Sequence, residues 1–550
     1  MLIEKLGLTM SSSKTKICVF KKGCFRRLIN FDFDGTSIDV VNNVKYLGLW
    51  LDSSLRWGKH INETSQKVIK YINLLKILSG PGWGVHQKHL RRLYISIIRS
   101  RIDYASFLFD NSCNSKLIKL DRIQNQALRV IGGFIRSTPI HVMENELCLP
   151  PLHIRRRYLA SKFILKSKSL VNNKTLQSLE NLSLFTGSNY WQHKKLPLLI
   201  DILSQYNSTP IHSSTQLGMF SLDKWISSID LSHIISDKIP SISKAKRHYS
   251  IIQLKQLCTS YIQEQYPDYH TIFTDGSKDK DLGGAAFLDP ILISHMKIKI
   301  DSDISIMHIE LIAILEALSY ILSVSGDKFV ILTDSKSSLQ HLARNTSHMR
   351  GIPTAYAIYE LILKLQSNSK MVRLQWIPSH VQYEENDVVD MLAKQACVDG
   401  VPMNITPLFS DYFGRAKNKC FDLWQEYFDE RSKEKGIWYR TIQPEISRVP
   451  WIDCDLNKNL MTIALRLRSG HIPSNKFNYL MKKVPSPCCD SCGVVDDVLH
   501  ILMECARNEN TRVSIFGPQR VNDIGLCNSM LAFPVSDKAQ HLYKLVISRS

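Results

Sequence analysis

The sequence predicts a multidomain protein in which an α/β domain lies between two helix-rich regions. At 550 residues the chain is too long for one hydrophobic core. From Thr271 onwards, apolar runs predict strand, strand, helix, strand, helix, helix, strand, helix, an alternation typical of α/β domains. Four cysteines crowd into Cys488 to Cys505. The expected segments are residues 1–165 (α-rich), 166–265 (helical connector), 266–400 (α/β domain), 401–480 (helical), 481–515 (cysteine-rich) and 516–550 (tail).

Charge is divided unevenly along the chain. The net charge is +20. Residues 1–170 hold 29 Lys and Arg against 11 Asp and Glu, a net of +18, whereas residues 268–400 hold 12 against 17, a net of −5. Such an excess favours a polyanionic partner, with nucleic acid first, over a merely solvated surface.

Several classes of protein are disfavoured. The chain has no apolar run near the roughly 20 uncharged residues of a membrane span, so no membrane association is expected. The start MLIEKLGLTM has no signal-peptide pattern, which predicts an intracellular protein of the nucleus or cytoplasm. Thirteen cysteines are too few for a disulfide scaffold at this length.

Residues 1–165 predict short strands and then helices. Strand-like runs cover Lys16–Phe20 and Lys45–Leu51, and helical periodicity begins at about His60. The helices are amphipathic with Lys and Arg along one side, which can follow a phosphate backbone, although a plain helical bundle is the alternative. The run Phe31–Thr36 resembles the D-x-D-G-T signature of haloacid dehalogenase-type phosphatases. The helical, basic residues after it favour a turn between two strands instead.

In the α/β domain, carboxylates follow apolar runs. Asp275 and Asp334 each lie towards the end of a predicted strand, where sites of α/β folds form, and Gly276 is expected to make a tight turn. Glu310 lies at the start of a helix predicted over Ile306–Leu322, and Asp390 in the first turns of the last helix. Clustered acids repel unless cations neutralise them. Two Mg²⁺ ions roughly 3.5–4 Å apart can activate water and stabilise the leaving oxygen of a phosphodiester, with a histidine assisting proton transfer.

The ordered set T-D-G-S, a Glu early in a helix, T-D-S, then S-H-x5-N-D-x2-D resembles the type 1 ribonuclease H family from residue 268 to residue 400. The resemblance implies a five-stranded mixed sheet flanked by helices, and cleavage of the RNA strand of RNA–DNA hybrids with two Mg²⁺ ions, Mn²⁺ being the alternative. It also implies the roles of six residues: Asp275, Glu310, Asp334 and Asp390 as metal ligands, His380 as the mobile histidine near the cleavage point, and Asn386 as a contact to the hybrid.

The segment between His380 and Asn386 departs from the family pattern. Many relatives have glycines there, whereas this chain has Val381-Gln-Tyr-Glu-Glu385. Asp387 stands where a Glu is usual. Fewer glycines predict a stiffer loop and a slower enzyme. The alternative to an enzyme is therefore a catalytically impaired remnant that binds nucleic acid.

The basic region carries a second resemblance. Its motifs are similar to the end of the reverse transcriptase of non-LTR retrotransposons of the jockey and I type, just after the palm and including the thumb, and a ribonuclease H domain can follow there. The palm is absent, so we expect an N-terminally truncated polyprotein without DNA synthesis. The only Asp-Asp pair, Asp496-Asp497, is interpreted as a surface turn. The motifs lie in Val41–Asp52, Ile98–Tyr104, Leu120–Arg129 and Pro150–Arg157.

The cysteine-rich segment predicts a structural zinc site. The spacing C-x2-C-x7-H-x4-C can supply four tetrahedral ligands, with two thiolates on a turn that Gly493 helps form. A chance group of thiols is the alternative, and Cys488 could replace Cys489. The motif resembles the cysteine–histidine segment at the C-terminal end of the same retrotransposon proteins, which strengthens the zinc interpretation. The ligands are Cys489, Cys492, His500 and Cys505.

Overall fold

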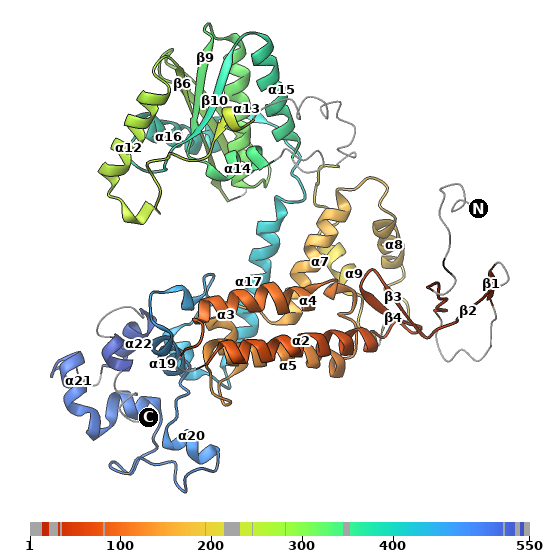
Figure 1. Ribbon diagram of the computed structural model, residues 1–550, viewed down its shortest axis with the longest axis vertical. Helices are drawn as coiled ribbons and strands as arrows, with labels where there is room; N and C mark the ends of the chain where they lie inside the picture. Colours follow the sequence, from red (N-terminus) through yellow and green to blue (C-terminus); the bar gives the residue numbers. More distant parts are fainter. Residues whose placement is uncertain are drawn as a thin grey trace. The chain divides into compact units, whose positions relative to one another are not determined.

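The chain divides into two compact units, each formed by segments that are separated in the sequence (Figure 1). Unit 1 comprises residues 1–161, 186–202 and 418–550, and unit 2 comprises residues 162–185 and 203–417. The computed structural model describes residues 11, 14–20, 31–33, 36–80, 83–192, 194–213, 231–244, 246–280, 282–344, 352–520, 523–533 and 539–543.

Unit 2 is built on a mixed seven-stranded sheet with the order β11-β8-β7-β6-β9-β10-β5. Strands β6, β7 and β8 form an antiparallel meander, and β9 lies parallel to both β6 and β10. The short edge strands β5 and β11 are each parallel to their neighbour. The strands are β5 (Ile235–Ser236), β6 (His270–Asp279), β7 (Leu282–Asp289), β8 (Ser294–Ile300), β9 (Lys328–Thr333), β10 (Met371–Trp376) and β11 (Val401–Met403).

Helices cover both faces of this sheet, because successive residues of its buried strands point to opposite sides. On β9, Phe329 and Ile331 pack with α13, α14 and α15, whereas Val330 and Leu332 pack with α12 and α16. The helices of unit 2 include α11 (Leu231–Ile234), α12 (Ile251–Gln265), α13 (Ile306–Ser323), α14 (Lys336–Arg344), α15 (Pro353–Ser367) and α16 (Glu384–Asp399), together with α8 (Lys174–Ser183).

The observed sheet is larger than the expected one. Strands β6 to β10 are the five that the family resemblance implied, but apolar periodicity alone had missed β8. Strands β5 and β11 extend the two edges from outside residues 266–400. Among the described residues, α13 is the one helix long and apolar enough to cross a membrane. It is a core helix here, because Ile309, Leu311 and Ile314 are fully buried against the sheet.

The tight turn expected at Gly276 is wrong. Strand β6 runs on to Asp279, and Gly276 pairs with Ala285 of β7. The glycine serves close packing instead, because a Cβ atom there would lie 3.0 Å from the backbone nitrogen of Glu310. The absence of a Cβ atom at Gly276 lets α13 approach the sheet.

In unit 1, the two ends of the chain share one hydrophobic core. Residues from Trp57 to Leu152 and from Ile442 to Tyr543 bury their apolar side chains together. Helices α2 and α5 lie side by side in this unit (Figure 1). Its helices include α2 (Gly58–Leu78), α3 (Gln87–Leu93), α4 (Ser100–Asp103), α5 (Asn114–Gly132), α6 (Ile140–Glu146), α18 (Ile437–Ile442), α19 (Lys458–Ser469), α20 (Asn475–Leu480), α21 (Glu509–Phe516) and α22 (Ile524–Ala532). The chain passes between the units within α7 (Leu152–Lys168), α9 (Leu198–Gln205) and α17 (Tyr412–Ser432), and also between residues 185 and 186.

Buried polar contacts join the same two ends. The guanidinium of Arg468 forms a 2.8 Å ion pair with the carboxylate of Glu146, and both side chains are almost fully buried. The amide of Gln87 donates to the Thr462 hydroxyl at 2.8 Å, and Asn145 accepts from the backbone nitrogen of Ser447 at 2.9 Å. Because such groups are costly to bury unpaired, these contacts make the arrangement of the two ends specific.

The short strands of residues 16–52 differ in part from expectation. Within Lys16–Phe20 only Ile17 forms a β-bridge, to Val40. The run Lys45–Leu51 is a hairpin rather than one strand, since β3 (Asn43–Tyr46) and β4 (Leu49–Asp52) pair antiparallel. Strands β1 (Phe31–Phe33) and β2 (Thr36–Ile38) also pair antiparallel, which agrees with a turn rather than a phosphatase motif. Asp34 and Gly35 lie outside the described residues.

Candidate functional site

Two of the predicted acids, Asp275 and Asp334, lie at the same end of the neighbouring parallel strands β6 and β9. The register of β6 and β9 ends with Thr274 opposite Thr333. Asp275 is the next residue of β6 and Asp334 is the first residue after β9, so their carboxylates come together at one edge of the paired region. The backbone carbonyl of Asp334 accepts a hydrogen bond from the indole nitrogen of Trp376 at 3.2 Å, which holds the end of β9 in place.

Helix α13 brings the third acid to the same place. Glu310 is buried in its second turn, next to Gly276 of β6. One ligand oxygen each from Asp275, Glu310 and Asp334 lie within 4.8 Å of one another. The Oε2 atom of Glu310 is buried and has no hydrogen-bond partner among the described residues. Three converging carboxylates with an unpartnered buried oxygen fit a divalent cation, because oxygen ligands are what Mg²⁺ prefers.

The fourth acid lies close by but is engaged elsewhere. Asp390, on α16, is near enough to Asp275 for a side-chain hydrogen bond to contribute to the pKa of Asp275. Its Oδ2 atom accepts a 2.7 Å hydrogen bond from the ammonium of Lys394, four residues along the helix. Residues four apart on a helix are neighbours, so the spacing of Asp390 and Lys394 is the sequence signal for this ion pair. The structure therefore brings three acids together and leaves Asp390 paired beside them.

Burial and mutual repulsion make the acid cluster resist ionisation. Burial, followed by the charges of Asp334 and Asp390, raises the pKa of Asp275 to about 8. Burial, with the charges of Asp275 and Asp334, also raises the pKa of Glu310 well above its ordinary value. The pKa of Asp334 is raised by burial and by Asp390, although the charges of His380 and Lys246 act to lower it. A cation placed among these groups would relieve the repulsion.

The loop after β10 carries the predicted histidine in an uncommon backbone conformation. His380 has φ 49° and Gln382 has φ 58°, in the left-handed region that favours glycine. Val381 between them is buried, and the ring of Tyr383 lies 5.7 Å from that of Phe273. The sequence thus lacks glycine at two positions whose backbone conformation favours it. The buried side chain of Val381 and the ring contact of Tyr383 hold the loop in place.

Asn386, the predicted contact to the hybrid, is almost fully buried in the structure. It lies in the first turn of α16 and is only 4% exposed. Its Oδ1 atom is buried without a hydrogen-bond partner among the described residues. This burial leaves little of the side chain for contact with a hybrid, so its substrate role stays a prediction.

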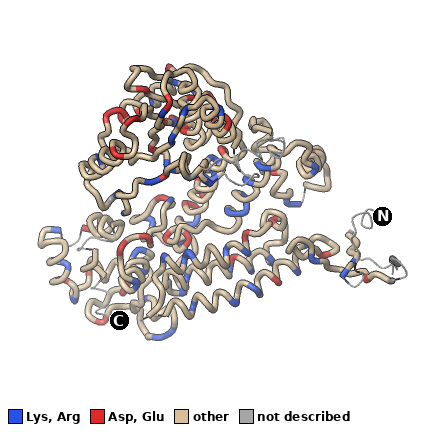
Figure 2. Tube along the Cα trace, turned by 45° about the horizontal axis from the view of Figure 1, so that its top comes forward, with Lys and Arg blue, Asp and Glu red and all other residues tan. Residues whose placement is uncertain are grey.

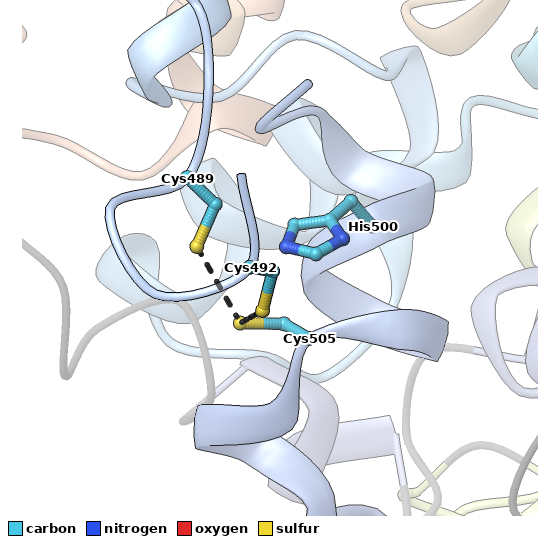
Figure 3. Close-up of side chains that lie close together, drawn as sticks. All are labelled: Cys489, Cys492, His500 and Cys505. Carbon is cyan, nitrogen blue, oxygen red and sulfur yellow. Dashed lines mark hydrogen bonds between the residues drawn. The ribbon is translucent and has the colours of Figure 1, made fainter. Parts of the chain in front are cut away.

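The cysteine-rich segment brings its four predicted ligands together in unit 1. The ligand atoms of Cys489, Cys492, His500 and Cys505 lie within 4.8 Å of one another, and Figure 3 shows the histidine ring facing the thiols. The Sγ of Cys505 is 3.9 Å from that of Cys489 and 4.0 Å from that of Cys492. Sulfurs bound to one tetrahedral zinc at roughly 2.3 Å lie about 3.8 Å apart, so the spacing fits zinc.

Local backbone explains this convergence. Gly493, with φ 71°, closes the turn, and its nitrogen donates to the carbonyl of Cys489 at 2.9 Å. Burial acts to raise the pKa of Cys489, but the backbone amides of Ser491 and Cys492 and the side chains of His500 and Cys505 lower it to about 6, which favours the thiolate that binds metal.

The structure selects Cys489 over Cys488, which does not join the four ligand atoms. The interpretation of Asp496-Asp497 as a surface turn is wrong for Asp496. That residue is buried, and its carboxylate accepts from the backbone nitrogen of Asn475 at 2.8 Å.

Many arginines of the basic N-terminal region have structural roles. Arg99 is buried and donates to Gln124, and Arg156 forms a 2.6 Å ion pair with Asp110. Arg91 donates to the backbone carbonyl of Leu147 at 2.5 Å. The predicted polyanion-binding surface is therefore carried by fewer residues than the sequence suggested. Lys and Arg are nevertheless spread along the N-terminal helices (Figure 2), and the exposed ones on α2 and α5 are Lys67, Lys70, Lys76, Lys119 and Arg122.

Comparison with known proteins adds to this geometry. Residues 267–398 match the family model for RNase H. These residues form a ribonuclease H domain. The match lies within the predicted 266–400, and a mixed sheet flanked by helices is the ribonuclease H-like fold that the sequence predicted.

Two Drosophila melanogaster proteins are similar to parts of the chain. The putative 115 kDa protein in type-1 retrotransposable element R1DM is 21% identical over 164 residues, which are 30% of this chain and 16% of that protein. The probable RNA-directed DNA polymerase from transposon BS is 23% identical over 113 residues, which are 20% of this chain and 12% of that protein. With the ribonuclease H domain, they confirm the expected relationship to non-LTR retrotransposon polyproteins. The chain spans less than a fifth of either relative.

Several solved structures match part of the chain, and we describe one of them. It is the N-terminal RNASE H domain of rv2228c from Mycobacterium tuberculosis, fused to maltose binding protein, and it is 17% identical. The similarity covers 23% of this chain and 93% of that one, with a TM-score of 0.19.

Proposed function

We propose that the ribonuclease H domain hydrolyses the RNA strand of RNA–DNA hybrids in a Mg²⁺-dependent reaction. The observation that carries the proposal is the cluster of Asp275, Glu310 and Asp334, with ligand oxygens within 4.8 Å of one another at the edge of the ribonuclease H sheet. Structural acids at strand ends are common, but three converging carboxylates with raised pKa values, two of them buried and one half-buried, favour a cation that offsets their repulsion.

The residues of the cluster hold the metal and manage protons. Asp275, Glu310 and Asp334 supply the oxygens, and Asp390 can add one when Lys394 releases it. Bound Mg²⁺ would supply an activated water and stabilise charge on the leaving oxygen. His380, close enough for its charge to act on Asp334, is suited to transfer a proton to the leaving group.

Hybrid binding needs positive charge that the ribonuclease H domain lacks. Residues 268–400 carry a net charge of −5, against +18 for residues 1–170. The exposed lysines and arginine of α2 and α5 can contact phosphates without reading sequence. The Cys489–Cys505 cluster, with four protein ligands and no open position, suits a structural zinc ion.

A second candidate function is binding of nucleic acid without cleavage. The observation that favours it is the 2.7 Å contact between Lys394 and Asp390, which occupies an oxygen of the fourth acid. The strained backbone at His380 and Gln382 points in the same direction.

The test is cleavage of a labelled RNA–DNA hybrid by the full chain with Mg²⁺. Asp334→Asn keeps the size of the side chain and removes its charge, so it should lower the rate at least about a hundredfold, as for loss of a major electrostatic contact. Asp327→Asn is the matched control, because Asp327 is exposed in the turn before β9, at the other end of the strand. Tight binding without cleavage by the wild-type chain would favour the second function. Equal cleavage by the wild type and Asp334→Asn would contradict the assignment of the site.

A further inference from the structure

The ribonuclease H domain of this chain is completed by residues that precede the family match. Strand β5 adds to the edge of β10, with Ile235 opposite Leu374. Helix α12 begins with a capping box between Ser250 and Gln253, and buries Cys258 in the core that α16 also joins. Residues 231–265 are therefore part of the same packed body, although they lie outside residues 267–398.

This preceding segment places a lysine beside the acid cluster. Lys246 begins a 3₁₀ turn over Lys246–His248, just before α12. Its ammonium donates a hydrogen bond to the backbone carbonyl of Ser379, the residue before His380. Its positive charge is also close enough to act on the carboxylate of Asp334, although burial still leaves the pKa of that group raised. The lysine thus lies within reach of both the acid cluster and the loop that carries the histidine.

The loop that Lys246 contacts needs support from outside. Each residue other than glycine in the left-handed region costs free energy and persists only when its surroundings hold it. His380 and Gln382 both adopt this conformation. Val381 anchors the loop from the core side, and the hydrogen bond from Lys246 holds it through the carbonyl of Ser379. A charged donor makes a stronger hydrogen bond than a neutral one.

We propose that Lys246 is a positioning residue of the ribonuclease H site, which fixes the turn at Ser379 and thereby holds His380 beside Asp334. The proposal rests on the proposed function for its catalytic consequence, but the contact itself belongs to the fold. It extends the functional site to the segment 231–265, which carries no motif in the sequence.

Kinetics of the full chain on an RNA–DNA hybrid test the catalytic consequence. Lys246→Met should lower kcat about tenfold and leave KM within about twofold, because the loss of one positioning bond misplaces His380 rather than the hybrid. Lys246→Arg should recover most of the rate, since it keeps a charged donor. Lys244→Met is the matched control, because it removes an exposed lysine from the same turn region. An unchanged kcat in Lys246→Met, or an equal loss in Lys244→Met, would overturn the proposal.

Hydrogen exchange separates this proposal from the proposed function. Amides of residues 377–385 should exchange at least about threefold faster in Lys246→Met than in the wild type or Lys244→Met, with the same melting temperature in all three. A wild-type chain that cuts no hybrid would defeat the proposed function, while faster exchange would still support the contact. Unchanged exchange in this segment would overturn the role of Lys246 whether or not the chain is active.

Discussion

The acid cluster and the cysteine–histidine cluster each hold their ligand atoms within 4.8 Å of one another, but different contacts hold the two clusters together. Asp275, Glu310 and Asp334 come from two strands and a helix, and the packing of the sheet holds them together against their own repulsion. Cys489, Cys492, His500 and Cys505 lie within residues 489–505, on a turn and a short helical segment. The core of unit 2 positions the acid cluster, so this site can form before an ion binds. The cysteine–histidine cluster is held by the Gly493 turn and by Val498, Ile501 and Leu502 in the core of unit 1, and a bound ion would add to these contacts.

The largest expected effect is loss of the thiol site. Cys505→Ser should abolish zinc binding and unfold the segment around residues 489–505, because a structural zinc ion contributes on the order of 10 kcal/mol to such segments. Elemental analysis should find about one zinc per wild-type chain and essentially none in the variant. Cys488→Ser is the control, since Cys488 lies outside the four ligands, and it should keep its zinc. Zinc retained by Cys505→Ser would contradict the site.

A second effect concerns the contact between the two ends of the chain. Arg468→Met leaves the carboxylate of Glu146 buried without its partner, which should lower the free energy of unfolding of unit 1 by about 3–5 kcal/mol. Urea unfolding measures this loss. The double variant Arg468→Met/Glu146→Gln should recover part of it, because no unpaired charge remains. A single variant as stable as the wild type would show that the pair contributes little.

A third effect is the pH dependence of the acid cluster. The folded pKa of Asp275 is about 8, raised above the ordinary value of 3.8. Its contribution to stability is therefore present at low pH and is lost as pH rises from about 4 to about 8. Without metal, Asp275→Asn should be more stable than the wild type at pH 8, on the order of 3 kcal/mol, with little difference at pH 4. Mg²⁺ should stabilise the wild type at pH 8. Urea unfolding in EDTA and in Mg²⁺ measures both, and a destabilised variant at pH 8 in EDTA would refute the electrostatic argument.

The smallest effect tests the loop after β10. Gln382→Gly removes the cost of a positive φ and should stabilise unit 2 by about 0.5 kcal/mol, after the entropy that glycine loses on folding. Gln382→Ala keeps the positive φ and should bring no gain. Thermal unfolding of both variants with Mg²⁺ present compares them. If the alanine variant gains as much as the glycine variant, strain at this residue is not the cause.

Sequence motifs named residues that the structure brings together, but they did not reveal the surroundings of those residues. Asp275 and Cys489 each lie with other candidate ligands in the structure, and their metal-binding roles stay predictions. The expected turn at Gly276 failed because a glycine that admits a helix looks the same in sequence as a glycine in a turn. No sequence pattern indicated a role for Lys246, because its hydrogen-bond partner Ser379 is 133 residues away along the chain. Amphipathic patterns also indicate which face of a helix is buried, but not that α5 shares its core with α19.

The shared core of unit 1 has a consequence for synthesis of the chain. Residues 57–152 leave the ribosome long before residues 442–543, which cover their apolar faces. At about 5–20 residues per second, the delay is on the order of half a minute. The ribonuclease H domain can fold within that interval. The apolar faces of the N-terminal helices stay exposed during this time and are prone to aggregation. We therefore expect a nascent chain stopped before α18 to bind chaperones more strongly than the finished protein.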